Sequence, residues 1–504
     1  YQRPQSYAGT LPCAGAQELA AGSRGSYSAR GLEDNGRLIE YPVQTKLWQR
    51  RMRERSVNKL PVSTYIGYGV GQIGGQILRD TPALILPFYM ATVVGLDPRL
   101  GGLVILIAKV WAVIADPLAG LISDKSESRW GRRRPFILAG GILAALCFIL
   151  LFFVPPTSSQ NLLFLYLTAV YLVLNTGYSL FSVPYLTMAS EMSDDAQERT
   201  TIMSFRNGFL GVGLIVVALT LPILFWLQES GYSASAAYER MGLIVGPIIA
   251  LSSLWVFFGT AQAPTKAATE ATVRLGEQLR IAWANKPFVT LIAANIVQYI
   301  SAGIGYAGGL FFFSLTMDLG QQALNVVTIW LIIISVASMA AMPLLVWAAA
   351  RLGKMTVYKW CLVLYAISIQ FYFFADKDSL WIVWLIAVAI GLFNGGFILM
   401  SFSVLTDVVN YDRIKTGISR EGVLSSVYSA VDKVGNALGG VLFMFCLALI
   451  GFVESSDGQM AEQSPSVIRW IGIAYIVAPA ALHASSILIL NRYKLNTADL
   501  QVPA

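Results

Sequence analysis

The chain has few charged residues, few cysteines and a single histidine for its length. Lys, Arg, Asp and Glu make up 13% of its 504 residues, about half the ~25% that is typical of soluble domains, while 56% are apolar. So little polar surface excludes an ordinary soluble enzyme and a disordered regulator. The four cysteines lie far apart and indicate neither a disulfide framework nor a metal cluster. The composition is that of a membrane protein.

Sequence motifs of common enzymes are also missing. The chain has no GxxxxGKS or GxxxxGKT segment for cradling phosphate, no HExxH zinc motif and no GxSxG nucleophile motif. We therefore expect neither ATP-driven transport nor catalysis by this chain. Nucleic acid is not expected as a partner, because the excess of positive charge is spread over loops between apolar segments.

Long apolar runs dominate the sequence from residue 61 onward. A helix of about 20 mostly apolar residues crosses ~30 Å of hydrocarbon with its backbone amides satisfied internally. We therefore expect an all-α membrane protein with twelve transmembrane helices. The predicted spans are 61–92, 100–123, 135–155, 161–190, 202–228, 238–261, 287–316, 322–350, 357–375, 380–408, 422–452 and 467–491.

Positive charges predict the orientation of these helices. Lys and Arg are frequent before the first span and after every second span, with the largest loop group within 125–134. The alternate loops contain only isolated cations: Arg99, Arg240, Lys377 and Arg469. Because positive loops stay in the cytoplasm, both termini are expected to be cytoplasmic, in a plasma (bacterial inner) membrane.

A polar connection at 263–286 divides the spans six and six. We predict a disordered cytoplasmic tail at 1–60, helical halves at 61–262 and 287–491, and a second tail at 492–504. Paired six-helix halves are typical of alternating-access carriers, whose substrate site lies between the halves near the membrane midplane.

Several segments resemble the glycoside–pentoside–hexuronide:cation symporters, a branch of the major facilitator superfamily. They are YGVGQIGGQ (68–76), ADPLAGLISDKSESRWGRRRPFILAGG (115–141), GYSLFSVPY (177–185) and DVVNYDRIKTGISREGVLSSVYSAVDKVGNALGG (407–440). The resemblance is collinear over most of 61–490. It implies the major facilitator fold and symport of a sugar or glycoside with a cation. We expect this small molecule and membrane lipids as partners, and function as a monomer.

The resemblance implies a cation-coupling site around Asp116. Asp116 matches a cation-binding carboxylate of the family, and Lys109 matches a basic residue beside it. The family's second carboxylate and a nearby asparagine are replaced by Ala112 and Ala115, which leaves Asp116 and Ser179 as ligands. Burial of a lone carboxylate favours its protonated form. We therefore expect H⁺ rather than Na⁺ as the co-transported ion, with no other cofactor.

The expected substrate site differs from the family pattern. Two sugar-binding carboxylates of the family align with Gln76 and Ser182, so the acidic sugar contacts are replaced by an amide and a hydroxyl, which also bond sugar hydroxyls. Asp80 either substitutes for the first carboxylate or neutralises Arg79. The predicted substrate-binding residues are Gln76, Asp80, Tyr178, Ser182, Arg206 and Lys433, with pairing to Glu198 or Asp195 as the alternative for Arg206.

Two sets of charged residues are expected to control the conformational change. An ion pair between Asp116 and Lys433 would connect the halves, and Asp432 would serve Arg79 in the same way. At the cytoplasmic side we predict a gate in which cations of one half contact acids and helix ends of the other. Its residues are Asp124, Arg129, Arg132, Arg133, Glu191 and Asp407.

Other functions on the same fold remain open at this point. One is a carrier of another substrate class, such as a lipid or drug exporter, and the other is a membrane sensor that uses the 1–60 tail as its effector. Two side chains also have alternative roles: Trp111 either packs or stacks on a sugar ring, and His483 is expected to be a hydrogen-bonded packing residue.

Overall fold

The computed structural model describes two separate units of the chain, residues 1–59 and 60–504. Within them, it describes residues 28–32, 38–42, 60–156, 159–193, 196–263, 280, 283–416, 421–455 and 461–495. In the first unit, β1 (Ser28–Leu32) pairs antiparallel with β2 (Leu38–Pro42). The remainder of the predicted 1–60 tail, most of the 263–286 linker and most of the 492–504 tail lie outside the described residues.

The second unit is helical throughout its described part. Its first half contains α2 (Val62–Gly69), α3 (Gly71–Thr92), α4 (Pro98–Asp124), α5 (Arg134–Leu151), α6 (Gln160–Glu191), α7 (Ala196–Glu229) and α8 (Ala234–Gly259). Its second half contains α10 (Lys286–Phe311), the π-helical turn η1 (Phe312–Thr316), the short η2 (Gly320–Gln322), α11 (Ala323–Leu352), α12 (Lys354–Gln370), η3 (Phe371–Phe374), α13 (Leu380–Thr416), α14 (Glu421–Leu449) and α15 (Pro465–Leu490).

The predicted order of twelve spans is confirmed when α2 and α3 are counted as one crossing. Eleven of the described helices are long and apolar enough to cross a membrane. The first crossing is less apolar, because α3 contains Gln72, Gln76, Arg79 and Asp80. The helix α13 continues to Thr416, beyond the expected end at 408, since its last turns are polar and do not need a hydrocarbon environment.

Local sequence signals determine where several helices begin. The side chains of Asp97, Ser233, Asn285 and Ser464 accept hydrogen bonds from backbone amides in the first turns of α4, α8, α10 and α15. These amides have no partner within the helix, so a short acceptor at this position stabilises the start. Proline follows the cap directly in α4 and α15, where its missing N–H costs nothing.

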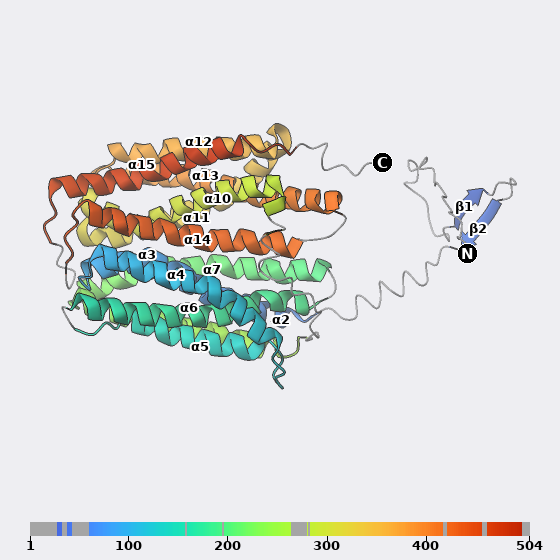
Figure 1. Cartoon of the computed structure of the whole chain (residues 1–504), viewed down its shortest axis with the longest axis horizontal. Coiled ribbons are helices and arrows are strands. Elements are labelled where there is room, and N and C mark those ends of the chain that lie inside the picture. Colours follow the sequence, from blue (N-terminus) through green and yellow to red (C-terminus); the bar gives the residue numbers. More distant parts are fainter. Residues whose placement is uncertain are drawn as a thin grey trace. The chain divides into compact units, whose positions relative to one another are not determined.

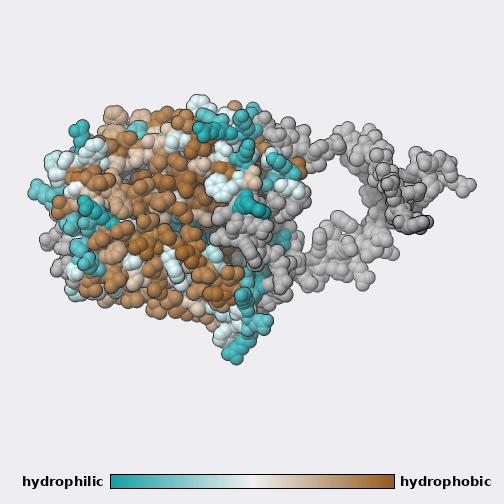
Figure 2. Space-filling view, viewed as in Figure 1, coloured by the Kyte–Doolittle hydropathy of each residue, from teal (hydrophilic) through white to brown (hydrophobic). Residues whose placement is uncertain are grey.

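Large apolar side chains cover the outside of the bundle. On the face shown in Figure 2, a broad brown band crosses the middle of the helices, with hydrophilic residues gathered toward both ends. Leu165, Phe258, Met339 and Leu449 are each between 65% and 84% exposed. A band of this extent is unfavourable in water and matches the hydrocarbon of a bilayer. The chain is therefore an integral, multi-pass membrane protein.

The helices lie side by side and pack as two halves (Figure 1). In the first half α6 packs on α4 and α5, and α3 packs on α7 and α8. In the second half α10 packs on α14 and α15, and α13 packs on α11 and α12. Among the described helices, four pairs join the halves: α4 with α14, α3 with α10, α7 with α11 and, over a smaller area, α3 with α14.

The bundle has two chemically different ends. At one end, here called the basic end, α2 begins and α15 finishes, and it contains Lys125, Arg129, Arg132, Arg133, Lys354 and Arg413. At the opposite far end, Phe88 contacts Phe311 with ring centroids 5.1 Å apart. The amide of Ser455 also donates to the carbonyl of Ala91 at 3.0 Å, and Met444 packs over Gly101. The halves are thus held together at the far end.

Glycine allows α10 and α14 to approach closely. A Cβ added at Gly303 would overlap the backbone carbonyl of Asn436, whereas one added at Gly305 would meet no atom within 4 Å. Small residues at such contacts let helix backbones pack in the absence of a hydrophobic driving force.

This contrast predicts opposite effects for two neighbouring substitutions. Gly303→Ala should destabilise the protein by about 1–3 kcal/mol, because the backbone of α14 has to move. Gly305→Ala should be neutral or slightly stabilising, since alanine favours a helix by up to about 1 kcal/mol over glycine. Thermal unfolding of the two detergent-purified variants measures the difference, and equal unfolding temperatures would contradict it.

Candidate functional site: a cluster of ion pairs between the halves

An ion pair joins the two halves near the middle of the helices. Lys433 of α14 places its Nζ 2.5 Å from the Oδ2 of Asp116 on α4. The same ammonium lies 5.9 Å from the ring centre of Tyr178 on α6. The predicted contact between Asp116 and Lys433 is therefore present. A charge at this depth costs about 2.5–3.5 kcal/mol even on lenient insertion scales, so pairing is the expected arrangement.

A second ion pair has the opposite polarity. Arg79 of α3 reaches Asp432 of α14 with an Nη2–Oδ2 distance of 3.2 Å, as predicted. Its Nε also lies 3.5 Å from the Oδ1 of Asp80, its neighbour in sequence. Asn436 donates to Asp432 at 2.8 Å from one turn further along α14. One guanidinium is thus shared between a carboxylate of each half.

Adjacent residues of α14 bring these pairs together. Asp432 turns toward α3 and Lys433 toward α4, so one short segment connects to two helices of the other half. We refer to Arg79, Asp80, Asp116, Asp432 and Lys433 as the central cluster.

The central cluster faces an accessible space within the bundle. The side chains of Arg79 and Lys433 are 49% and 40% exposed. Arg79 nevertheless lies close to Tyr178 of α6 and Tyr306 of α10, so helices of both halves surround it. A long side chain that is enclosed by helices and still half exposed borders a hollow rather than lipid.

Amide side chains continue from the cluster along α3. Gln72 donates to Gln76 at 3.1 Å, and Gln76 donates to Asp80 at 2.5 Å. All three side chains are buried. The spacing of four residues places them on one face of the helix, so Gln76 and Asp80 are neighbours, as their spacing predicts.

Two predicted serines of α6, the helix that carries Tyr178, are buried. Ser179 is fully buried and Ser182 is 6% exposed, and neither hydroxyl has a partner among the described residues. Lys109 is directed elsewhere, because it donates to Asn175 at 3.3 Å and lies over the ring of Tyr171. The unpartnered hydroxyls of Ser179 and Ser182 are available for hydrogen bonds to a bound polar molecule or for coordination of a cation.

Arg206 of α7 lies toward the basic end, near Tyr68 and Tyr185. Its Nε is buried without a hydrogen-bond partner among the described residues. Glu198, which was an alternative partner, accepts hydrogen bonds from the amide of Leu60 and the hydroxyl of Tyr65. Asp195, the other alternative, lies outside the described residues.

Two further side chains are placed by the structure. Trp111 donates to Thr176 at 2.8 Å and shares the exposed apolar face of α4 with Ile107, Ile114 and Leu118, away from Asp116. It does not line the cluster, so stacking on a bound sugar there is not supported. His483 is 1% exposed, bonds Ser301 and the carbonyl of Pro479, and stacks on Tyr365, as expected of a packing residue.

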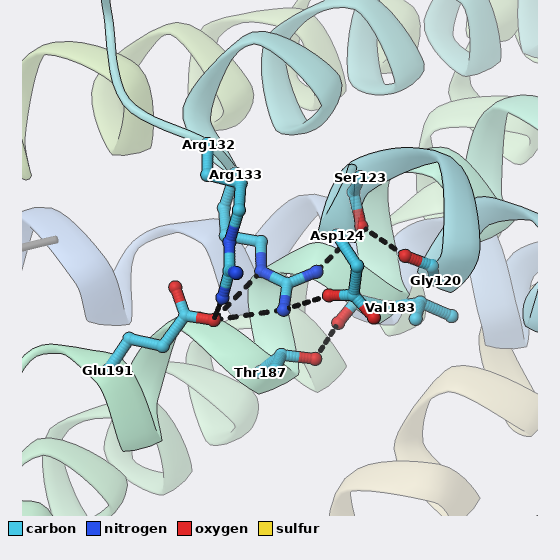
Figure 3. A network of polar contacts seen from close by, with 8 residues as sticks. All are labelled: Gly120, Ser123, Asp124, Arg132, Arg133, Val183, Thr187 and Glu191. Atoms are coloured by element: carbon cyan, nitrogen blue, oxygen red, sulfur yellow. Dashed lines mark hydrogen bonds and ion pairs between the residues drawn. The ribbon is translucent and has the colours of Figure 1, made fainter. Parts of the chain in front are cut away.

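The predicted gate residues form contacts within each half, which differs from the expected contacts between halves. In Figure 3, Arg133 extends between Glu191, Asp124 and Ser123. Its Nη2 lies 2.9 Å from the Oε1 of Glu191, and Arg132 reaches the same oxygen at 2.5 Å. The network clamps the α4–α5 connection to the end of α6. The loop between α4 and α5 is short, so the acidic residues within range of Arg132 and Arg133 belong to the same half.

The second half repeats this arrangement with other residues. Asp407 of α13 binds Lys354, which starts α12, with Nζ–O distances of 2.7 and 2.8 Å. Arg129 takes no part in the network of the first half; its guanidinium stacks over Trp130, 4.8 Å from the ring centre. The roles of all the predicted residues in binding, coupling and gating stay predictions.

The second half contains a polar network that the sequence did not predict. Asn295 accepts hydrogen bonds from Tyr358 and Ser401, and Ser401 in turn contacts Tyr428 at 2.7 Å. Tyr428 is one turn before Asp432 and close enough for the charge of Asp432 to act on it, so the network lies next to the central cluster. Four uncharged residues on four helices give no common signal along the chain. Only Asn295 in an apolar span could have drawn attention to it.

Two hollows on the described surface lie away from the central cluster. One, of about 600 Å³, is an apolar groove between α12 and α15. The other, of about 340 Å³, is at the far end and is lined by residues of both halves, including Phe88, Tyr232 and Gln321. Because neither hollow contains residues of the central cluster, the candidate site is identified by its ion pairs and exposed charged side chains and not by the volume of a pocket.

The network of Figure 3 predicts unequal effects of two arginine substitutions. Arg133→Ala removes the cation that Glu191 and Asp124 share, while Arg132 still pairs with Glu191 and Asp124 is partly exposed, so we expect a loss of about 1–3 kcal/mol. Arg129→Ala should change stability by less than about 0.5 kcal/mol, because its side chain is at the surface. Thermal unfolding in detergent tests both, and a wild-type unfolding temperature for Arg133→Ala would contradict the assignment.

Comparisons with known proteins agree with this architecture. The family model described as "MFS/sugar transport protein" matches residues 67–497. The inner membrane symporter YicJ of Escherichia coli (strain K12) is 25% identical over 446 residues, covering 88% of this chain and 94% of that protein. The glucuronide carrier protein homolog of the same organism is 26% identical over 440 residues, covering 86% and 92%.

A solved structure shows the same fold. A variant of the nucleoside transporter NupG superposes with a TM-score of 0.61 at 14% identity, covering 84% of this chain and 99% of that one. The predicted major facilitator fold and the absence of an enzyme active site in the sequence agree with these matches. This chain belongs to the MFS/sugar transport protein family and is a membrane transporter rather than an enzyme.

Proposed function

We propose that this protein is a symporter that moves a sugar or glycoside together with a cation, with H⁺ as the coupling ion. The observation that carries the proposal is the central cluster, in which ionisable groups of both halves meet at an accessible space inside the bundle. The family match and the relatives named as a symporter and a glucuronide carrier support the substrate class and the coupling.

The basic end faces the cytoplasm in this proposal. Basic loops are retained on the cytoplasmic side, and Lys354, Arg132 and Arg133 belong to such loops. With the halves in contact at the far end, the accessible space opens toward the cytoplasm. The structure then corresponds to an inward-open state of an alternating-access cycle.

Hydroxyl and amide groups around the cluster suit a sugar. The buried hydroxyls of Ser179 and Ser182 have no partner among the described residues, and Tyr178 presents an aromatic ring beside Lys433. Sugars offer donors and acceptors in equal measure, which such groups bond in both directions. Arg79 and Lys433 add exposed cations that strengthen hydrogen bonds to oxygen atoms.

Coupling is assigned to the ion pair between Asp116 and Lys433. While Asp116 is charged, the pair connects α4 to α14. A proton on Asp116 removes the attraction, so the halves are free to change their relative position. The second oxygen of Asp116 has no hydrogen-bond partner among the described residues, so it is the free position on this carboxylate.

Uptake by proteoliposomes tests the proposed function directly. A panel of radiolabelled neutral and acidic sugars is applied with an inward pH gradient, with an inward Na⁺ gradient, and with neither. We expect one sugar class to accumulate above equilibrium only with the pH gradient. Accumulation driven by Na⁺ alone would overturn H⁺ coupling, and transport of lipids or drugs with no sugar response would overturn the substrate class.

The coupling assignment predicts a specific defect for Asp116→Asn. The amide cannot exchange a proton, so uphill accumulation should fall to the level of simple equilibration. Exchange of internal for external sugar should persist, because it requires no net proton movement. Asp318→Asn is the matched control: this carboxylate is exposed at the far end, where Lys377 holds its pKa below the usual value. Normal accumulation by Asp116→Asn would contradict the assignment.

A further inference from the structure

The charges of the central cluster do not balance. Three carboxylates, those of Asp80, Asp116 and Asp432, share the two cations Arg79 and Lys433. Lys433 lies 2.5 Å from Asp116 and neutralises it. Arg79 therefore has to serve both remaining carboxylates, at 3.2 Å for Asp432 and 3.5 Å for Asp80. One negative charge is left without a full partner.

Other charged and titratable groups near Asp80 do not supply this partner. Lys109 of α4 is a third cation close enough for its charge to act on Asp80, but it forms no ion pair with it among the described residues, because its ammonium donates to Asn175 and lies over the ring of Tyr171. Arg206 of α7 lies toward the basic end beside Tyr68 and Tyr185. The remaining groups around Asp80 and Arg79 are neutral phenols, Tyr306 of α10 and Tyr178 of α6.

Of the two carboxylates that share Arg79, Asp80 has its negative charge less well neutralised than Asp432. Its side chain is 8% exposed, compared with 20% for Asp432. Asp432 has both oxygens within reach of Arg79 and also accepts a hydrogen bond from Asn436. Asp80 has only the longer contact to Arg79 and one amide donor, Gln76. A buried carboxylate that lacks a full counter-charge becomes neutral by binding a proton.

The amides on α3 can accommodate either form of Asp80. Hydrogen bonds now run from Gln72 to Gln76 and from Gln76 to the carboxylate. If both amides rotate by half a turn, a protonated Asp80 donates to Gln76, which donates to Gln72. A side-chain amide offers a donor and an acceptor from nearly the same position, so no other atom needs to move.

We propose that Asp80 is a second proton-binding site of this transporter, occupied while Arg79 is paired with Asp432. The proton comes from water in the accessible space and bonds to a carboxylate oxygen of Asp80, and no other bond changes. When the halves move and Arg79 leaves Asp432, the guanidinium is free to pair with Asp80 and the proton is released. This inference rests on the proposed function for the identity of the coupling ion.

Infrared spectroscopy of the purified full-length protein provides a test that needs no substrate. In a maltoside detergent, which has no carbonyl group, the C=O stretch of protonated carboxyl groups is followed as pH is raised. Surface carboxyl groups are ionised above about pH 6, because their ordinary pKa values are near 4. We expect a band that remains above this pH in wild type and Asp116→Asn and is lost in Asp80→Asn.

Two further variants separate a proton site from a structural effect. Asp80→Glu keeps a carboxyl group and should keep a band. Asp432→Asn should move the wild-type band to lower pH, because Arg79 then serves Asp80 alone. Thermal unfolding checks that each variant is folded.

The outcomes distinguish this inference from the proposed function. A band that persists in Asp80→Asn, that is lost in Asp116→Asn, or that is absent from wild type would overturn the site at Asp80. None of these three infrared results bears on pH-driven sugar uptake, which the proteoliposome experiment tests separately. If uptake fails to respond to pH while the band behaves as expected, Asp80 binds a proton and the coupling assignment is wrong.

Discussion

The cost of placing charges inside a membrane controls the arrangement of this molecule. Asp116 and Lys433 come from different halves, and each is stabilised at this depth by the other. Arg79 and Asp432 repeat the interaction with reversed polarity on a neighbouring helix. Since α14 supplies one acid and one base in succession, a single helix connects to two helices of the other half. Any movement of the halves has to break or exchange these pairs.

The other described contacts between the halves are neutral. At the far end the interface consists of aromatic rings, a methionine over a glycine and a backbone hydrogen bond. Such contacts separate without leaving an unpaired charge. At the basic end, Arg133 binds Glu191 and Asp124, and Lys354 binds Asp407, each within its own half. These pairs make each half rigid, so that the halves can move as bodies around the central cluster.

The sequence was sufficient for the helices and for several of the charged contacts. Apolar runs predict the order of the spans because a membrane helix must satisfy its own backbone, whatever its neighbours are. The same reasoning singled out Asp116, Lys433, Arg79 and Asp432, since charged residues in apolar spans need partners. It did not reveal the network of Asn295, Ser401 and Tyr428, whose members are uncharged and lie on different helices.

The membrane-spanning architecture, and a short set of charged groups that had to be paired, follow from the order of residues along the chain. Which pairs form depends on how the helices pack: Arg133 binds acids of its own half, and Arg79 lies between Asp432 and Asp80. Hydropathy depends on the composition of each segment, so it can be read along the chain. The balance of charge in the central cluster depends on distances between side chains of different helices, and packing alone sets those distances.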